Sequence, residues 1–287
     1  MDIRTSKDLL KTSNEKIIKQ RRKRRLSFSA LFFILFVLLL IGGIFFLRNQ
    51  KFLLTTVNVS GNVFVESKDI ENGIKDYESG KYFWLIPKRN LVLIHTNKLE
   101  KYLIKNFPNI KTVSVTRNFP HTVSVYMTER KGVYLWCGND ISSIEKNSDN
   151  PCDFVDNDGF IFSVAPYFSG TQFFAFFGGD SGIGKVIIDK TEFQKIIYIK
   201  KGIEDLGLHP FAVSILPEGE YHLYINDDGT SNNNSPQIKF NNKINEERII
   251  ENLSSAISSK VFIDGSAIKK LSYIDLRFGN KVFYKFK

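Results

Sequence analysis

The sequence has few of the residues that build most catalytic and metal sites. It holds two cysteines and four histidines in 287 residues, and no H-E-x-x-H pair occurs. Two cysteines without an adjacent histidine are too few ligands for a structural zinc site. No G-x-S-x-G motif marks a nucleophile elbow. We therefore expect no enzyme activity, no catalytic residue, no metal and no cofactor.

Nucleotide binding has one apparent motif, and it is incomplete. Residues 179–185 match the G-x4-G-K core of a phosphate-binding loop. That loop needs Ser or Thr after the lysine to hold Mg²⁺ and a following helix, whereas Val186 comes next and residues 186–188 favour a strand. We expect a glycine-rich loop here and no nucleotide. Asp156 and Asp158 lack the remaining ligand spacing of a calcium loop, so we expect a turn there.

Acidic residues are scarce at the N-terminus, and this scarcity explains most of the net charge. Residues 1–25 hold ten Lys and Arg against three acids, which leaves only +3 of the total +10 for residues 26–287. A basic arm could bind nucleic acid, but the position of the charge next to an apolar run favours a membrane signal. We expect no nucleic-acid partner.

The longest apolar run follows this tail directly. Residues 30–47 contain no charged or strongly polar side chain, and with residues 26–29 the stretch reaches 22 residues. A helix of that length spans about 30 Å, the thickness of bilayer hydrocarbon. A cleaved signal peptide and a buried soluble helix fit less well, because the run is long and apolar on all sides. The sequence predicts a transmembrane helix over 26–47.

The charge on either side of this helix predicts its orientation. The cluster at 21–25 precedes it, whereas only Arg48 and Lys51 follow closely. The positive-inside rule then puts the basic tail, 1–25, in the cytoplasm and residues 48–287 outside, in a single-pass protein of the plasma membrane. An oxidising compartment would permit a disulfide between Cys137 and Cys152.

Residues 52–130 change their hydrophobic period in an ordered way. Alternation at 56–59 predicts a strand, and 65–77 predicts a short helix capped by Ser67. Asn97 is expected to cap a second helix with Leu99, Leu103 and Ile104 inward. Two alternating runs at 110–115 and 123–127 predict a hairpin. The order β-α-α-β-β fits a small α+β domain.

This string of motifs resembles the POTRA domain of the bacterial cell-division family FtsQ, also called DivIB. The resemblance is carried by residues 57–62, 80–85, 107–115, 117–120, 125–131 and 134–136. From the residues alone, Arg117 and Pro120 are expected to shape the hairpin, Glu129 and Arg130 to end a strand in solvent, and Gly61 to supply a turn dihedral. The resemblance implies an α+β fold with a signal anchor, a POTRA domain at 52–130 and a β-domain at 131–287.

Residues 131–287 predict a mainly antiparallel β-domain with two helices. Residues 154–162 and 221–229 each suggest two strands around an Asp-Gly turn. Helices are expected over 191–208, with Phe193, Ile196, Ile197 and Ile203 inward, and over 246–257, with Ile249, Ile250 and Leu253 inward. Residues 271–286 predict a terminal hairpin around Gly279-Asn280.

The string from Asp275 to Phe278 is similar to the end of the FtsQ β-domain. In that family the last strands form an edge that pairs with an FtsB/DivIC-type partner by strand addition. The resemblance thus implies the following partner-binding residues: Tyr273, Asp275, Arg277, Phe278, Val282 and Tyr284. Val282 and Tyr284 could instead simply face the core.

The resemblance implies a non-enzymatic divisome scaffold at the septum. It would contact other membrane division proteins and recruit an FtsB/DivIC–FtsL-like complex. A POTRA-bearing transport or secretion component is one alternative, although the sequence shows no long run of barrel strands. A membrane-anchored extracytoplasmic hydrolase is another, and no motif supports it.

Overall fold

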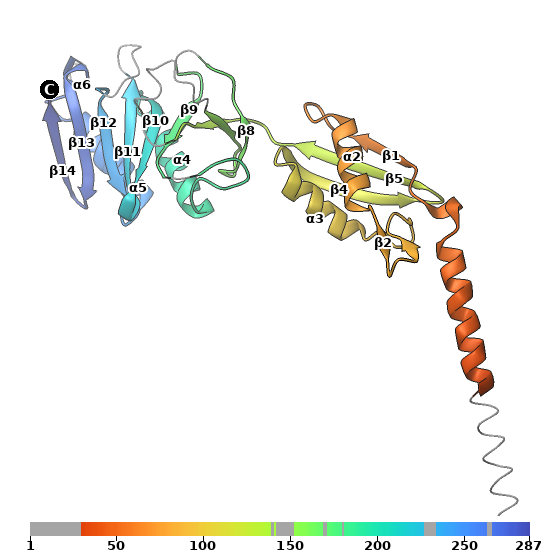
Figure 1. The fold of residues 1–287 in the computed structure, drawn as a ribbon. Helices are drawn as coiled ribbons and strands as arrows, with labels where there is room; N and C mark the ends of the chain where they lie inside the picture. Colours follow the sequence, from red (N-terminus) through yellow and green to blue (C-terminus); the bar gives the residue numbers. More distant parts are fainter. Residues whose placement is uncertain are drawn as a thin grey trace, which may run out of the picture. The chain divides into compact units, whose positions relative to one another are not determined.

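A computed structural model describes residues 30–138, 141, 152–168, 171–179, 181–226, 234–262 and 266–287 (Figure 1). The basic tail, the first residues of the apolar run and the Asp-Gly turn near residue 228 lie outside the described residues. Contacts divide the chain into two compact units. The first combines Met1–Ser60, Glu66–Glu100 and Ser114–Tyr126, and the second combines Gly61–Val65, Lys101–Val113 and Met127–Lys287.

The apolar run forms a straight helix from Ala30 to Leu47. Its mean hydropathy is 3.1 and none of it is buried within the protein. Within the part of the chain that the structure describes, it is the one helix long and apolar enough to cross a membrane. A short 3-10 helix, Gln50–Phe52, follows, with the Asn49 side chain accepting a hydrogen bond from the Lys51 N–H at its start.

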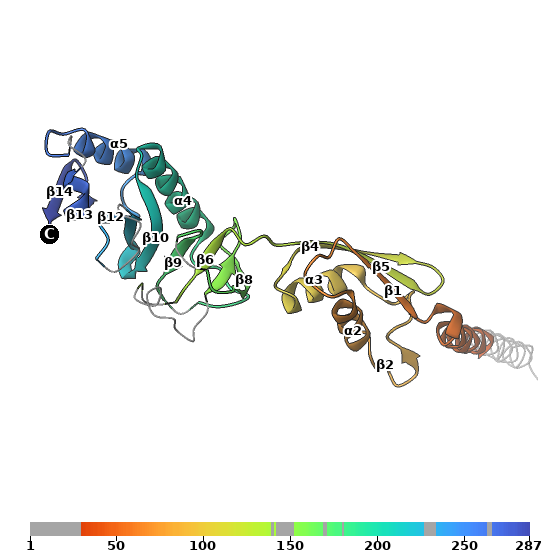
Figure 2. The same cartoon turned by 90° about the horizontal axis from the view of Figure 1, so that it is seen from above.

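The next residues form a three-stranded sheet in the order β1-β5-β4. Its strands are β1 (Thr56–Ser60), β4 (Ile110–Asn118) and β5 (Thr122–Glu129), and β1 runs parallel to β5. Helices α2 (Ser67–Tyr77) and α3 (Thr96–Asn106) lie on one face of it (Figure 2). The predicted β-α-α-β-β order is confirmed.

Details of both helices differ from the sequence prediction. Glu66, not Ser67, is the N-cap of α2, and its side chain makes no capping bond. α3 begins one residue before Asn97, so Asn97 lies inside the helix and does not cap it. Leu99 and Leu103 are fully buried, but Ile104 is 39% exposed. The expected inward position of Ile104 was wrong, because a spacing of one residue turns a side chain by about 100° around the helix axis.

Two local features of this region are a turn at Gly61 and a short hairpin between α2 and α3. Gly61 has φ of +82°, and a Cβ there would lie 2.1 Å from the Met127 carbonyl oxygen, so the predicted turn role is confirmed. Between α2 and α3, strands β2 (Lys81–Tyr82) and β3 (Ile86–Pro87) form a separate hairpin that the alternation did not predict.

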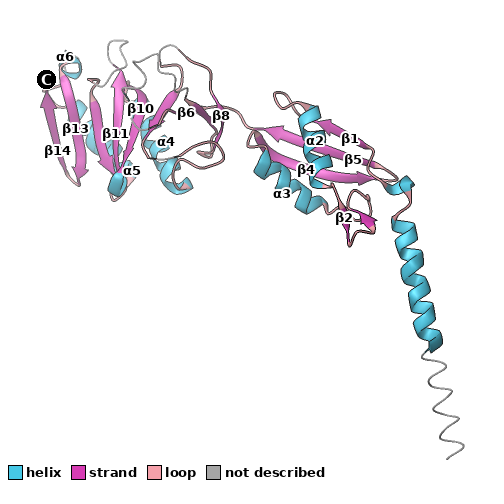
Figure 3. Ribbon diagram, in the orientation of Figure 1, coloured by secondary structure: helices cyan, strands magenta, loops and turns pink. Residues whose placement is uncertain are grey.

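The remaining strands join one nine-stranded sheet in the order β14-β13-β12-β11-β10-β9-β6-β7-β8. They are β6 (Tyr134–Trp136), β7 (Asp153–Val155), β8 (Ile161–Val164), β9 (Phe174–Phe177), β10 (His209–Leu216), β11 (Glu220–Asn226), β12 (Gln237–Asn241), β13 (Leu271–Phe278) and β14 (Lys281–Phe286). Most pairings are antiparallel, as expected, but β6 with β9, β9 with β10 and β12 with β13 are parallel. Figure 3 shows this mostly strand-built region beside its helices.

Helices α4 (Lys190–Asp205) and α5 (Glu246–Ile257) cover one face of this sheet (Figure 2). Asp189 caps α4 by accepting a hydrogen bond from the Thr191 N–H, and Asn245 caps α5 in the same way. The main core lies between sheet and helices and includes Phe193, Ile196, Ile203, Ile249 and Leu253. All five inward positions were predicted. Ile197 and Ile250 were also predicted to be inward, but both are only partly buried.

A smaller apolar cluster lies on the other side of the sheet and includes Leu135, Phe177, Phe211 and Tyr224. Cys137 and Cys152 pack against this cluster and are joined by a disulfide across 15 residues of chain.

Candidate partner-binding site

The terminal hairpin lies at one end of the nine-stranded sheet. β13 pairs with β12 in parallel and with β14 in antiparallel orientation. Among the described residues no strand pairs with the other side of β14. Backbone N–H and C=O groups along the outer side of Lys281–Phe286 are therefore placed to accept a further strand.

Two of the expected contact residues are held in an internal ion-pair network. The Arg277 guanidinium donates to both carboxylate oxygens of Asp275, at 2.9 and 2.6 Å, and to Glu220 at 2.7 Å. Burial by itself would raise the pKa of Asp275, but the hydrogen bonds and charge of Arg277 outweigh it and lower that pKa. The carboxylate in turn raises the pKa of Arg277. Asp275 and Arg277 thus tie β13 to Glu220 of β11. Most of their hydrogen-bonding atoms already have a partner within the protein, which leaves few for a binding partner.

The apolar side chains of the hairpin divide between surface and core. Phe278 is 56% exposed and Tyr284 is 44% exposed, whereas Val282 packs against the main core. The Tyr284 ring meets Phe262 edge-on at 5.4 Å. Phe278 is therefore the expected residue most available to a partner, Tyr284 is partly available, and Val282 takes the core position that the sequence left open.

Tyr273 lies on the face of the sheet opposite to α4 and α5. The Lys239 ammonium sits 4.5 Å from the centroid of its ring, a cation–π contact. Such a contact at a partly exposed site contributes about 0.5–1 kcal/mol. Tyr273 is thus held in place by a neighbouring strand.

A row of aligned residues crosses the face opposite to α4 and α5, from β11 to β14. The strand register places His222 beside Lys239, Lys239 beside Asp275, and Asp275 beside Phe283. The neighbouring row, Leu223, Ile238 and Ile274, is buried under the helices, so alternation along each strand directs the His222 row to the opposite face. Burial first, and then the charges of Lys239 and Arg277, lower the pKa of His222 to about 4.

Phe283 was missed by the sequence analysis. It is 51% exposed, and its ring meets that of Phe278 edge-on at 5.3 Å. The two rings form an aromatic pair at the rim of the sheet. The sequence did contain one clue. Val282, Phe283 and Tyr284 are consecutive apolar residues, and neighbours in a strand point to opposite faces, so Val282 and Tyr284 share one face and Phe283 lies on the other. One of these two faces had to carry an exposed ring.

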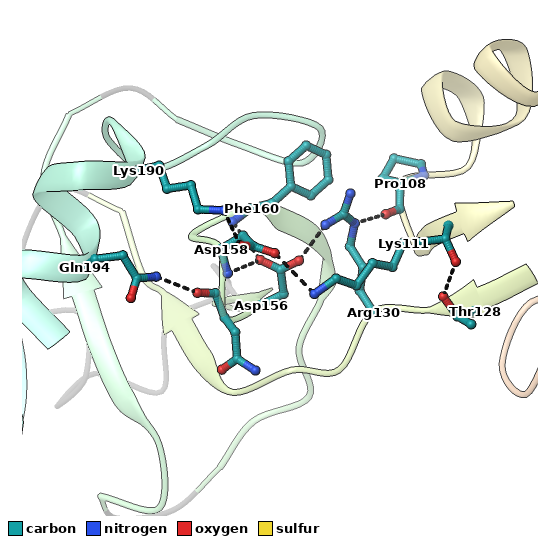
Figure 4. Close-up of polar contacts among 11 residues, drawn as sticks. Pro108, Lys111, Thr128, Arg130, Asp156, Asp158, Phe160, Lys190 and Gln194 are labelled. Carbon is teal, nitrogen blue, oxygen red and sulfur yellow. Dashed lines mark hydrogen bonds and ion pairs between the residues drawn. The ribbon is translucent and has the colours of Figure 1, made fainter.

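β5 ends at Glu129, as expected, but neither Glu129 nor Arg130 is simply solvated there, because both side chains have partners in the protein. Arg130 donates to Asp156, which is 2% exposed, and to the Pro108 carbonyl at 3.1 Å (Figure 4). Its guanidinium lies 4.0 Å from the centroid of the Phe160 ring. Glu129 accepts hydrogen bonds from three consecutive backbone N–H groups, those of Val63, Phe64 and Val65.

The two aspartates beside Arg130 belong to the same cluster, as Figure 4 shows. Asp156 accepts hydrogen bonds from the backbone N–H groups of Asp158 and Phe160, which closes the expected turn. Asp158 forms ion pairs with Lys111 at 3.2 Å and Lys190 at 2.9 Å. The hydrogen bonds from these lysines lower the pKa of Asp158. Within the described residues no group of His, Cys, Asp or Glu is arranged to hold a metal ion.

Arg117 and Pro120 both lie in the hairpin between β4 and β5, but the Arg117 side chain reaches out of the hairpin, so its expected role in shaping the hairpin is not confirmed. Arg117 donates to the carbonyls of Val92 and Ile94, at 3.3 and 3.4 Å, and Pro120 follows a cis peptide bond. Both residues have structural roles here.

Among the described residues the chain has an apolar helix, then a β-α-α-β-β domain, then a strand-rich region. Residues 52–130 match the family model of the POTRA domain, FtsQ-type. No curated protein matches the chain. The chain thus carries an FtsQ-type POTRA domain, and with the apolar helix before it the arrangement is consistent with an FtsQ/DivIB-like, division-related protein. Proteins with this domain are generally non-enzymatic.

Proposed function

We propose that this chain is a non-enzymatic scaffold of the bacterial division machinery. The basic tail would lie in the cytoplasm, Ala30–Leu47 would span the plasma membrane, and the folded domains would lie outside, at the septum. The observation that carries this proposal is the FtsQ-type POTRA domain at residues 52–130, directly after an apolar helix. The charge asymmetry across that helix supports the orientation.

In this proposal the scaffold recruits an FtsB/DivIC–FtsL-like pair through β14. An extended segment of the partner would pair with the outer side of Lys281–Phe286, and main-chain hydrogen bonds would supply much of the affinity. The exposed rings of Phe278 and Phe283 would cover apolar side chains of that segment. Asp275, Arg277 and Tyr273 would hold β13 in place beside β12 and β11, because their partners within the sheet are Glu220 and Lys239.

The aromatic pair provides the test. Replacing Phe278 or Phe283 with Glu should weaken partner binding by about 1–2 kcal/mol, roughly tenfold, because each ring is an exposed contact beside the edge. The measurement is co-purification and titration of the full-length chain with FtsB/DivIC–FtsL-like proteins from the same organism. Stability should change little, since both rings are half exposed.

Tyr167→Glu serves as the matched control. Tyr167 is 72% exposed and follows β8, the strand at the opposite end of the same sheet. Its replacement should leave partner binding unchanged. Unaltered binding by both the Phe278→Glu and Phe283→Glu variants would exclude this edge as the partner site.

A further inference from the structure

The β2–β3 hairpin presents the most exposed large apolar side chains among the described residues. Phe83 is 90% exposed and Trp84 is 92% exposed, more than any side chain on the apolar helix, where Phe45 reaches 81%. Tyr82 and Leu85 beside them are 41% and 48% exposed. Four adjacent apolar residues in water form a patch, and a patch of this kind usually marks a contact surface.

The backbone of the tip holds the two rings outward. Phe83 and Trp84 have φ angles of 46° and 64°, and the Leu85 N–H donates to the Tyr82 carbonyl at 3.0 Å. This is a tight turn whose two central positions favour Asn and Gly, since bulky residues are disfavoured at positive φ. A domain that needed only a turn here would be more stable with small residues, so the rings point to a use outside the domain.

The base of the hairpin is tied to the end of the apolar helix. The Asn90 side chain donates to the carbonyl of Leu47, the last residue of that helix, at 2.6 Å. Backbone hydrogen bonds join Leu54 to Arg89 and Leu91 to Phe52, at 2.9 and 2.8 Å. Figures 1 and 2 both show the hairpin at the end of the sheet where the apolar helix joins.

The length of the hairpin allows its tip to reach the membrane surface. From Leu85, which closes the turn, to Pro87 the extended chain rises about 7 Å at ~3.3 Å per residue, and the turn residues Phe83 and Trp84 lie beyond it. The headgroup layer extends roughly 5–8 Å beyond the hydrocarbon on each side of a bilayer. Leu47 would lie near the hydrocarbon boundary if the apolar helix spans the membrane. Asn90, three residues after Pro87, ties the base of the hairpin to Leu47, so headgroups come within reach of the tip.

The composition of the tip and its surroundings matches that layer. Aromatic residues with a polar edge, Tyr and Trp, are enriched where headgroups meet acyl chains. Exposed cations lie next to the patch in sequence at Lys81, at the base of the hairpin at Arg89, and after the apolar helix at Arg48 and Lys51. The Lys88 ammonium lies 5.7 Å from the centroid of the Tyr82 ring. Cations in this position are attracted to lipid phosphates, while their stems lie along apolar surface.

We propose that the tip at residues 82–85 inserts into the headgroup layer of the bilayer that holds the apolar helix, as a second membrane contact. The first contact is the helix itself, and two contacts restrict the tilt and height of the POTRA sheet relative to the lipid. This inference requires that Ala30–Leu47 spans a membrane, but it does not require a division partner.

Trp84 itself can report on the contact. The chain has two tryptophans, and the other one, Trp136, is 4% exposed in the core. The full-length Trp136→Phe variant, reconstituted at one copy per nanodisc, should lose tryptophan emission roughly twofold or more when the discs contain lipids brominated near the headgroup. Strong quenching by aqueous iodide, without quenching by brominated lipid, would overturn the proposal.

A second tryptophan position controls for the general proximity of the domain to lipid. Tyr126 is 61% exposed and pairs with Ser60, at the end of β1 far from the apolar helix. In a chain that carries Trp84→Phe, Trp136→Phe and Tyr126→Trp, brominated lipid should leave the emission unchanged. Equal quenching at positions 84 and 126 would contradict a contact specific to the hairpin.

A comparison that keeps Trp136 avoids any folding defect of its replacement. The wild-type chain and Trp84→Phe share the buried Trp136, so the difference between them isolates Trp84. Quenching that disappears in Trp84→Phe supports the proposal, and equal quenching in both rejects it. Alkaline carbonate extraction, performed in parallel, reports separately on whether the apolar helix anchors the chain.

Discussion

At the scale of single residues, Arg130 has the largest predicted effect on stability. Its partner Asp156 is 2% exposed, and the carboxylate keeps only two backbone donors when the guanidinium is removed. Replacing one partner of a buried ion pair costs about 3–5 kcal/mol, and the two remaining donors favour the lower end of that range. We expect Arg130→Met to lower the free energy of unfolding by about 3 kcal/mol in urea titrations of the chain in mild detergent.

Lys111→Met provides the comparison for that measurement. Lys111 pairs with Asp158, but both side chains are more than a third exposed and Asp158 retains Lys190. An exposed pair of this kind contributes about 0–1 kcal/mol. If the two variants lost the same free energy of unfolding, the burial of Asp156 would not be the cause of the Arg130 effect.

His222 makes stability depend on pH. Its pKa in the folded protein is about 4, below the ordinary value of 6.5, because burial and the positive charges of Lys239 and Arg277 disfavour the protonated ring, while Glu220 and Asp275 oppose them. The unfolded chain then binds more protons between these two pKa values, so the free energy of unfolding falls as pH drops through this window.

The variant His222→Gln should lose less stability between pH 6.5 and pH 4.5 than the wild-type chain. The measurement is urea unfolding at both pH values, with His209→Gln as control, since His209 is exposed at the start of β10. Identical pH dependence in wild type and His222→Gln would show that His222 does not carry this effect.

At the scale of elements, the disulfide joins the end of β6 to the start of β7. Cys137 and Cys152 close a loop of 15 residues beside the smaller apolar cluster. In the chain-entropy account, a loop of this length adds about 3 kcal/mol to stability. Unfolding of the chain with and without dithiothreitol should show a loss of this size.

The double variant Cys137→Ser/Cys152→Ser controls for effects of dithiothreitol that do not come from the disulfide. It should be less stable than the wild type and indifferent to dithiothreitol, because the sequence contains no other cysteine. A wild-type chain whose stability does not respond to the reductant would argue that the packing of Leu135 and its neighbours holds β6 and β7 together without the disulfide.

At the scale of the whole molecule, the orientation depends on charge at one end of the apolar helix. Neutralising the five basic residues at 21–25 should invert a measurable share of the chains, because the K/R bias near the helix sets topology. The measurement is digestion of the folded domains by protease added to intact spheroplasts. Neutralising Arg4 and Lys7, which lie farther from the helix, should have little effect. Undigested domains in the wild type would contradict the proposed orientation.

The sequence alone was sufficient for features that depend on local periodicity. Residue spacing and turn chemistry within a short window predict four such features. They are the apolar run, the β-α-α-β-β order, the helix over Glu246–Ile257 and the terminal hairpin. The FtsQ-type domain was recognisable for the same reason, because its motifs are short and their order along the chain is preserved.

Only the tertiary structure decided which residues meet across long stretches of chain. Glu220 reaches Arg277 from 57 residues away, and Asp156 reaches Arg130 from 26. The parallel pairing of β12 with β13 was equally unpredictable from spacing, and alternation alone left open which of Val282 and Phe283 faces outward. The physical reason is that alternation divides a strand into two faces, whereas strand register and the position of the covering helices decide which face is buried.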